Sequence, residues 1–273
     1  MFLIKIQTAN IAKKMVFLHE MSKKTFIVLK KTASTNAYLL EMAEDERVGT
    51  VVVAHEQTAG KGMGANSWES EPGMNLTFSM GVDMSFMKAA DQFLLSQAVP
   101  LGLLDVLGPM LKARDVATRS EALTVKWPND LYFGSRKLCG ILINSTIHGM
   151  DMGVSVIGIG LNVNQMQFQD WPTHPISMRM VLGEEVALEP LMHRLVEAIE
   201  LRIGQLRSPQ GIEIIKKAYL DGLYRYHTWA DYEVNGKKTR LFITGIDQFG
   251  RLETLDESGA KFVYDIKEIK FIS

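Results

Sequence analysis

A stretch of seventeen residues near the middle of the chain constrains the fold more than any other segment. It begins Lys126-Trp127-Pro128-Asn129-Asp130-Leu131-Tyr132-Phe133 and continues, after Gly134-Ser135, as Arg136-Lys137-Leu138-Cys139-Gly140-Ile141-Leu142. Apolar runs at 123–127, 131–133 and 138–143 predict short strands, because breaker residues separate them. Cations and one carboxylate therefore fall at strand ends of a sheet, a placement that suits a polyanionic ligand.

The rest of the chain predicts a mixed architecture. Further strands are expected at 25–29, 50–54, 75–80 and 154–162, and helices at 36–43, 91–112, 190–206 and 211–226. Pro100 is expected to kink the second helix. Strands and helices do not alternate regularly, which predicts an α+β fold with helices packed on a mixed β-sheet.

From Thr228 onward the pattern changes to short strands. Turn signals stand at Asn235-Gly236, Gln248-Phe249-Gly250 and Glu257-Ser258-Gly259. They predict a small all-β module of about 45 residues, or hairpins that pack onto the main domain. The expected division is a leader or tail at 1–24, a main domain at 25–226 and a C-terminal domain at 228–273.

Composition excludes several classes of protein. Lysine plus arginine (30) nearly balances aspartate plus glutamate (31) in 273 residues, so the clustered positive charge of a nucleic-acid binder is not expected. No run approaches the roughly 18 apolar residues of a membrane span, and no signal peptide is evident. A single cysteine fits a reducing cytoplasm.

Cysteine and histidine give no sign of a metal centre. Cys139 lies between apolar neighbours with no histidine close in sequence, which predicts a buried core residue. The six histidines show neither His-x-x-x-His nor Cys-x-x-Cys spacing, so a structural zinc site is not expected.

Three further motifs accompany the central stretch. They are Ser34-Thr35-Asn36; Gln57-Thr58-Ala59-Gly60-Lys61-Gly62 with Ser67-Trp68-Glu69-Ser70 and Gly73-Met74-Asn75-Leu76; and Gly158-Ile159-Gly160-Leu161-Asn162-Val163-Asn164. In this order, over most of residues 26–165, they resemble the biotin protein ligases.

The resemblance implies a class II synthetase-like catalytic domain followed by an SH3-like barrel. It also implies a two-step reaction with ATP and Mg²⁺: biotin and ATP form biotinyl-5'-AMP and pyrophosphate, and biotin then passes to a lysine of a biotin carboxyl carrier domain of a carboxylase. Fixed cations would offset the repulsion between carboxylate and phosphate, each on the order of 4 kcal/mol near 4 Å. A homodimer is possible, and neither a DNA nor a membrane partner is expected.

Site residues follow from the matched motifs. Lys137 is expected to be the central catalytic lysine, with Asp130 and Lys126 beside it. Asp130 could associate with Mg²⁺ or activate the acceptor lysine, and Lys126 could contact phosphate or only pair with Asp130. The residues expected at biotin are Ser34, Thr35, Asn36, Gln57, Lys61, Gly62, Met63, Lys137 and Gly140. Those expected at ATP are Lys61, Trp68, Asn129, Lys137 and Asn162.

Each of these residue types also has an ordinary structural explanation. Ser34 to Asn36 could cap a helix, and Trp68 could be a core aromatic. Asn129 and Asp130 could form a turn, and Asn162 could end a strand.

The glycine-rich segment departs from the commonest family pattern, Gly-Arg-Gly-Arg-Arg-Gly. Lys61 keeps a charge but loses the planar fork of arginine, Met63 removes a charge, and Gly64 and Ala65 follow. We expect this segment, which would close over the ligand as a lid, to retain the adenylate less firmly.

The N-terminal region is too short for one known addition to this family. Only 33 residues precede Ser34, less chain than a winged-helix DNA-binding domain needs, so operator binding is not expected. A mobile tail, or a later start at Met15 or Met21, is the expected explanation of the leader and is preferred to a targeting peptide. Two rival functions remain: a lipoate or octanoate ligase of the same fold, and a catalytically impaired sensor of biotin or its adenylate.

Overall fold

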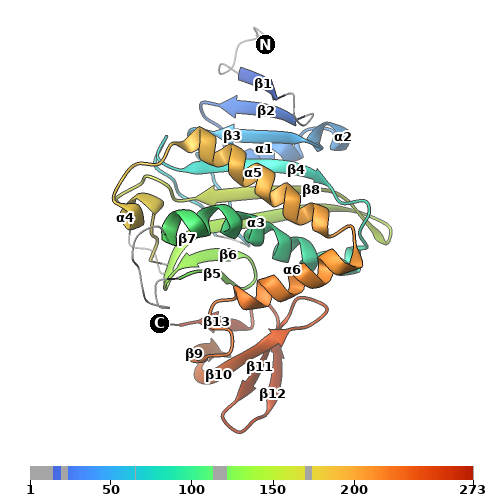
Figure 1. Ribbon diagram of the computed structural model, residues 1–273, viewed down its shortest axis with the longest axis vertical. Coiled ribbons are helices and arrows are strands. Elements are labelled where there is room, and N and C mark those ends of the chain that lie inside the picture. Colours follow the sequence, from blue (N-terminus) through green and yellow to red (C-terminus); the bar gives the residue numbers. More distant parts are fainter. Residues whose placement is uncertain (1–14, 20–23, 65, 113–121, 170–173, 273) are drawn as a thin grey trace. The chain divides into compact units, whose positions relative to one another are not determined.

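The computed structural model describes residues 15–19, 24–64, 66–112, 122–169 and 174–272 (Figure 1). The chain forms two compact units, and each is built from two separate segments. The first comprises Met1–Ala89 and Arg136–Val196, and the second comprises Ala90–Ser135 and Glu197–Ser273. The predicted division into 25–226 and 228–273 does not coincide with these units and stays a prediction.

A mixed sheet forms the first unit, with strands in the order β1-β2-β3-β4-β8-β7. Only β2 and β3 pair in parallel; the other neighbouring strands are antiparallel. The strands are β1 (Met15–His19), β2 (Lys24–Leu29), β3 (Thr50–Ala54), β4 (Leu76–Asp83), β7 (Arg136–His148) and β8 (Asp151–Leu161). The strand β1 falls within the predicted leader and forms an edge of this sheet.

Helices cover both faces of this sheet because successive strand residues point to opposite sides. On one face, Leu39 of α1 (Thr35–Leu40) packs with Ile27, Val52 and Val156 in a buried cluster. On the other face, the ring of Phe26 lies 4.6 Å from that of His193 in α5 (Leu188–Gln205), which continues into the second unit. The short helices α2 (Glu44–Arg47) and α4 (Met178–Leu182) complete the first unit.

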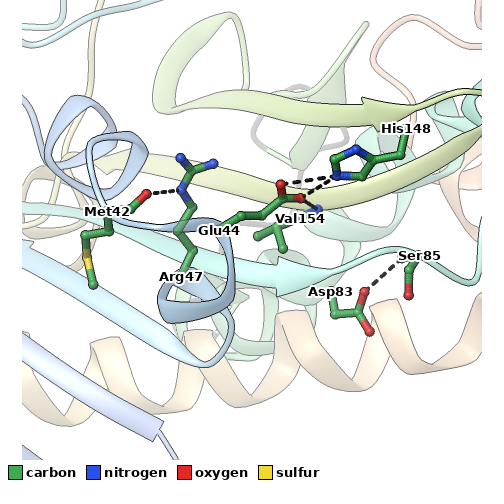
Figure 2. A network of polar contacts seen from close by, with 7 residues as sticks. All are labelled: Met42, Glu44, Arg47, Asp83, Ser85, His148 and Val154. Carbon is green, nitrogen blue, oxygen red and sulfur yellow. Dashed lines mark hydrogen bonds and ion pairs between the residues drawn. The ribbon is translucent and has the colours of Figure 1, made fainter.

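A carboxylate ties α2 to the β7–β8 hairpin, as Figure 2 shows. The Glu44 carboxylate accepts a hydrogen bond from Val154 N (2.9 Å) and lies 3.0 Å from His148 Nε2. The bond from Val154 N and then the His148 ring lower the pKa of Glu44. Gly153 leaves room for this contact, since a Cβ there would lie 2.7 Å from the His148 ring.

The second unit has the long helix α3 (Phe93–Lys112) in its core, after the short helix η1 (Ala89–Asp91). The helix contains Pro100 and packs against α6 (Pro209–Asp221), and the kink expected at Pro100 stays a prediction. Its length and apolar composition would allow it to cross a membrane, but most of it is buried inside the protein. It is therefore a core helix, and the sequence reading underestimated its apolar length.

The strands of the second unit form a hairpin and a separate sheet. The hairpin joins β5 (Leu123–Lys126) to β6 (Asp130–Phe133), and Val125 N donates to Gly222 O just after α6. The antiparallel sheet has the order β12-β11-β10-β9-β13. Its strands are β9 (Trp229–Val234), β10 (Lys237–Ile246), β11 (Leu252–Asp256), β12 (Lys261–Tyr264) and β13 (Ile269–Phe271).

The predicted turns of this C-terminal sheet are confirmed. Asn235, Gly236, Gly250 and Gly259 all have positive φ, the conformation that favours glycine and asparagine. The sheet is consistent with an SH3-like module, and the mixed sheet and helices confirm the α+β fold.

Candidate functional site

A largely buried polar network links α1, the segment after β3 and the strand β4 of the first unit. Thr35 N donates to Gln57 Oε1 (2.7 Å), and the Thr35 hydroxyl lies 3.1 Å from the same oxygen and 2.8 Å from Ser79 Oγ. Ser34 caps α1 by accepting from Ala37 N (3.4 Å). The network offers donors and acceptors inside an otherwise apolar wall.

The backbone explains why these residues meet. The segments that follow β2 and β3 run parallel, and Thr58 N donates to Thr32 O while Ala59 N donates to Ala33 O. Ser79 is fully buried in β4 and was missed by the sequence reading. The signal for it was a serine and a threonine, Thr77, two positions apart in an apolar strand.

A patch of glycine backbone lies beside this network on β7 and β8. Gly140 pairs directly with Gly160, and Leu142 pairs with Gly158. Asn36 Nδ2, which donates to Leu142 O (3.4 Å), would lie only 2.8 Å from a Cβ on Gly158. The sheet therefore has a flat, side-chain-free floor next to its polar network.

The indole of Trp68 rests on this floor. A Cβ on Gly140 would lie 2.9 Å from Trp68 Cζ3, and a Cβ on Gly160 would overlap the indole. Trp68 Nε1 is buried without a hydrogen-bond partner, and Lys137 Nζ lies 5.8 Å from the ring centroid. Trp68, Lys137 and Gly140 therefore lie close together, and the contacts expected of them with biotin and ATP stay a prediction.

The glycine-rich segment is held by its backbone. Trp68 N donates to Gly60 O (2.9 Å), Gly62 N donates to Asn66 O (2.8 Å), and Lys61 pairs with Ser67. The side chains of Lys61 and Met63 are exposed, Met63 to 44%. Neither side chain is buried in the polar network or on the floor.

The side chain of Asn162 makes hydrogen bonds to the backbone of two other segments in this structure. The side chain is buried and Nδ2 donates to Ile176 O (3.2 Å) and Lys137 O (3.4 Å), so it holds the beginning of β7. The expected contact of Asn162 with ATP stays a prediction, and it would require these bonds to be exchanged. Cys139 is buried, as expected.

Lys126, Asn129 and Asp130 belong to the second unit. Lys126 and Asp130 stand opposite each other in the β5–β6 hairpin, and the Trp127–Pro128 peptide bond between them is cis. Lys126 Nζ donates to Tyr132 OH (3.1 Å). Burial, and then the Asp130 carboxylate, raise the pKa of Tyr132.

The surroundings of Lys126 form an aromatic cage that the sequence did not predict. Lys126 Nζ lies 4.6 Å from the ring centroid of Tyr132 and 5.2 Å from that of Phe271 in β13. Tyr224 stacks on both rings at 6.0 and 6.2 Å. Cation–π contact of this kind fixes the ammonium group in place.

No resident metal centre is formed by the described part of the chain, where no three His, Cys, Asp or Glu side chains gather. Asp130 is a single carboxylate beside an asparagine. That donor set fits Mg²⁺ only when phosphate oxygens supply further ligands.

Comparison with known proteins identifies related sequences. A sequence model of the "Biotin/lipoate A/B protein ligase family" matches residues 27–162. The "Bifunctional ligase/repressor BirA" of Salmonella typhimurium is 32% identical over 239 residues, which cover 85% of this chain and 67% of that protein. The "Biotin--[acetyl-CoA-carboxylase] ligase" of Paracoccus denitrificans is 28% identical over 86% of this chain and 96% of its own length.

A solved structure gives the same fold. The biotin protein ligase from Aquifex aeolicus in complex with biotin and ATP superposes with a TM-score of 0.73 at 20% identity, covering 91% of this chain and 98% of that one. The two folds match although the two sequences are only 20% identical. Together with the family match and the coverage of the Salmonella relative, this match in fold shows that this chain belongs to the biotin/lipoate protein ligase family, among its biotin protein ligases.

Proposed function

We propose that this protein is an ATP-dependent biotin protein ligase. In the first step a biotin carboxylate oxygen attacks the α-phosphorus of ATP, pyrophosphate leaves, and biotinyl-5'-AMP forms. In the second step a lysine amine of a carrier domain attacks the acyl carbon, an amide bond forms, and AMP leaves. The observation that carries this proposal is the polar network of Thr35, Gln57 and Ser79 beside the glycine floor, with Lys137 at the same floor.

The chemistry of biotin matches this arrangement. Its ureido ring needs donors and acceptors, which Thr35, Gln57, Ser79 and Asn36 supply from fixed positions. Its apolar bicycle can lie flat on backbone only where no side chain projects, as at Gly140 and Gly160. The Lys137 ammonium, which lies at the same floor, is proposed to meet the biotin carboxylate as a charge held at the reacting centre.

Trp68 must leave the floor for this to happen. Its indole covers Gly140 and Gly160, and its N–H has no partner there. A buried donor without a partner costs about 1–3 kcal/mol, so the covered arrangement is easily exchanged for a ligand. Once displaced, the indole offers a flat face on which adenine can stack.

The phosphates require the remaining cations. We expect Lys61 and Lys137 to contact them, and Asn129 to contact the nucleotide. Lys126 and Asp130 stay proposed as catalytic residues. Mg²⁺ would neutralise phosphate charge while bound mainly through nucleotide oxygens. Asp130 is the carboxylate that would accompany the ion or activate the acceptor lysine.

The acceptor is proposed from the relatives. The Paracoccus protein is named as a ligase of acetyl-CoA carboxylase, so we propose a biotin carboxyl carrier domain as the partner of this chain. A homodimer also remains a proposal.

Pyrophosphate release tests the proposed reaction. Purified protein is mixed with ATP and Mg²⁺ and with biotin, lipoate or octanoate, without a carrier, and release is followed with time. We expect pyrophosphate release with biotin but not with lipoate or octanoate. A Lys137→Met variant serves as the control and should lose this release. Pyrophosphate release only with lipoate or octanoate would show a lipoate or octanoate ligase instead. No release with any of the three acids would refute ligase chemistry.

A further inference from the structure

A cavity of about 480 Å³ lies within the second unit, apart from the residues of the proposed ligase reaction. Its apolar lining comes from Phe93 and Leu94 at the beginning of α3, Leu220 of α6 and Ile246 at the end of β10. The volume falls in the range of sites for small molecules.

The walls of this cavity are fixed without a ligand. The Phe93 ring meets the buried Tyr219 ring edge to face at 6.0 Å. Gly250 permits Phe93 to pack on the β10–β11 turn, because a Cβ on Gly250 would overlap the Phe93 ring. The Asp247 carboxylate holds the same turn by accepting from Phe249 N and Arg251 N, each at 2.9 Å.

One polar group in the lining lacks a partner. Gln97, one turn after Phe93 in α3, is 5% exposed, and its Oε1 is buried without a hydrogen bond. A buried carbonyl oxygen in this state is costly, and the terminal torsion of glutamine is soft, so the carboxamide can turn toward a donor. Oε1 does not face the cavity in the present orientation, so a molecule that donates one hydrogen would satisfy it after the carboxamide has turned.

The charges around the cavity already have partners. The pairs are Glu213 with Lys216 (3.0 Å), Lys217 with Asp221 (2.6 Å) and Asp247 with Arg251 (2.7 Å). A charged ligand would compete with these pairs, whereas an uncharged one leaves them intact.

We propose that this cavity is a second ligand site, which binds a small uncharged molecule with an apolar body and one O–H or N–H donor. Phenols, alcohols and amides have this chemistry. The apolar body packs on Phe93, Leu94, Leu220 and Ile246, and Gln97 accepts the hydrogen bond.

Fluorine NMR of three matched probes tests this proposal on the full chain. The probes are 4-fluorophenol, 4-fluorotoluene and 4-fluorobenzoate, and line broadening gives the affinity of each. We expect the phenol to bind and the benzoate to bind more weakly. In Gln97→Met, which keeps side-chain length but removes the amide, the ratio of phenol affinity to toluene affinity should fall about fivefold, the usual net contribution of one hydrogen bond.

A second variant locates the binding. Leu220→Trp places a large ring in the cavity, and it should abolish binding of both the phenol and the toluene while the chain still unfolds cooperatively. Phenol binding that persists in Leu220→Trp, an unchanged affinity ratio in Gln97→Met, or preferred binding of the benzoate would each overturn the proposal.

Discussion

Two regions of the first unit, both proposed to contact the ligand, are held together by different kinds of hydrogen bond. In the network, Thr35 and Ser79 are buried and Gln57 is half-buried, and hydrogen bonds link a helix, the segment after β3 and the strand β4. The segment from Gly60 to Trp68 is held by backbone bonds, and its side chains Lys61 and Met63 are exposed. The difference supports the proposal that the contacts to the biotin ring are formed before the ligand binds, whereas closure over the phosphates follows binding.

Removing the charge at Lys137 should have the largest effect. In Lys137→Met we expect adenylate formation to fall by roughly 10²- to 10³-fold, since one fixed electrostatic group at a reacting centre contributes about that much. Lys61→Met is the matched control, because it removes the same charge from the exposed segment. Pyrophosphate release measures both, and a larger loss in Lys61→Met would reverse the comparison.

Breaking the polar network should weaken biotin binding. Thr35→Val removes the hydroxyl between Gln57 Oε1 and Ser79 Oγ, and we expect the KM for biotin to rise about tenfold, with the KM for ATP unchanged, as one unmade buried hydrogen bond predicts. Thr50→Val is the control, since the Thr50 hydroxyl donates to Glu46 O (2.7 Å) outside the network. Equal KM values for the two variants would show that the network is only structural.

Restoring a cation to the exposed glycine-rich segment should make this segment retain the adenylate longer. In Met63→Arg we expect release of biotinyl-5'-AMP to slow by up to about fivefold, the effect of one solvent-exposed charge pair. Met166→Arg adds the same charge to another exposed methionine. The dissociation rate of labelled adenylate measures both, and an unchanged rate in Met63→Arg would refute the idea that this segment leaks the intermediate.

The smallest effect is expected at the Glu44 contact, which stabilises the fold without touching either region. Because the pKa of Glu44 is lowered from 4.5, the carboxylate contributes stability above that pH and loses it as the pH falls through the lower folded value. We expect Glu44→Gln to lower the unfolding midpoint at neutral pH, and the gap between the two proteins to close in acid, as the pH falls through the lowered pKa of Glu44. Thermal unfolding across pH checks this against Glu41→Gln, and a gap that persists in acid would contradict it.

Much of the fold could be predicted because the signals are local. The strand Thr50–Ala54 has the bounds that its apolar run predicts, and the glycine turns of the C-terminal sheet follow from their backbone preference. The helix expected at 36–43 ends earlier, at Leu40, before the separate helix α2.

The parts of the site that were missed depend on tertiary packing. Ser79 becomes part of the polar network only because β4 lies next to β3 and β8, and Phe271 reaches Lys126 across more than a hundred residues of sequence. The resting place of Trp68 on Gly140 and Gly160 depends on the register of β7 with β8. The periodicity of apolar residues in the sequence does not reveal which residues of two strands lie opposite each other.

The cage around Lys126 has a practical consequence for work with this protein. Phe271 stands near the end of the chain, and Arg225 anchors the next residue by donating to Ile272 O (2.9 Å). Loss of Phe271, by substitution or by proteolysis before it, would remove one wall of the cage around a lysine that is expected to contact phosphate. Kinetic values measured after such a change would describe an altered cage.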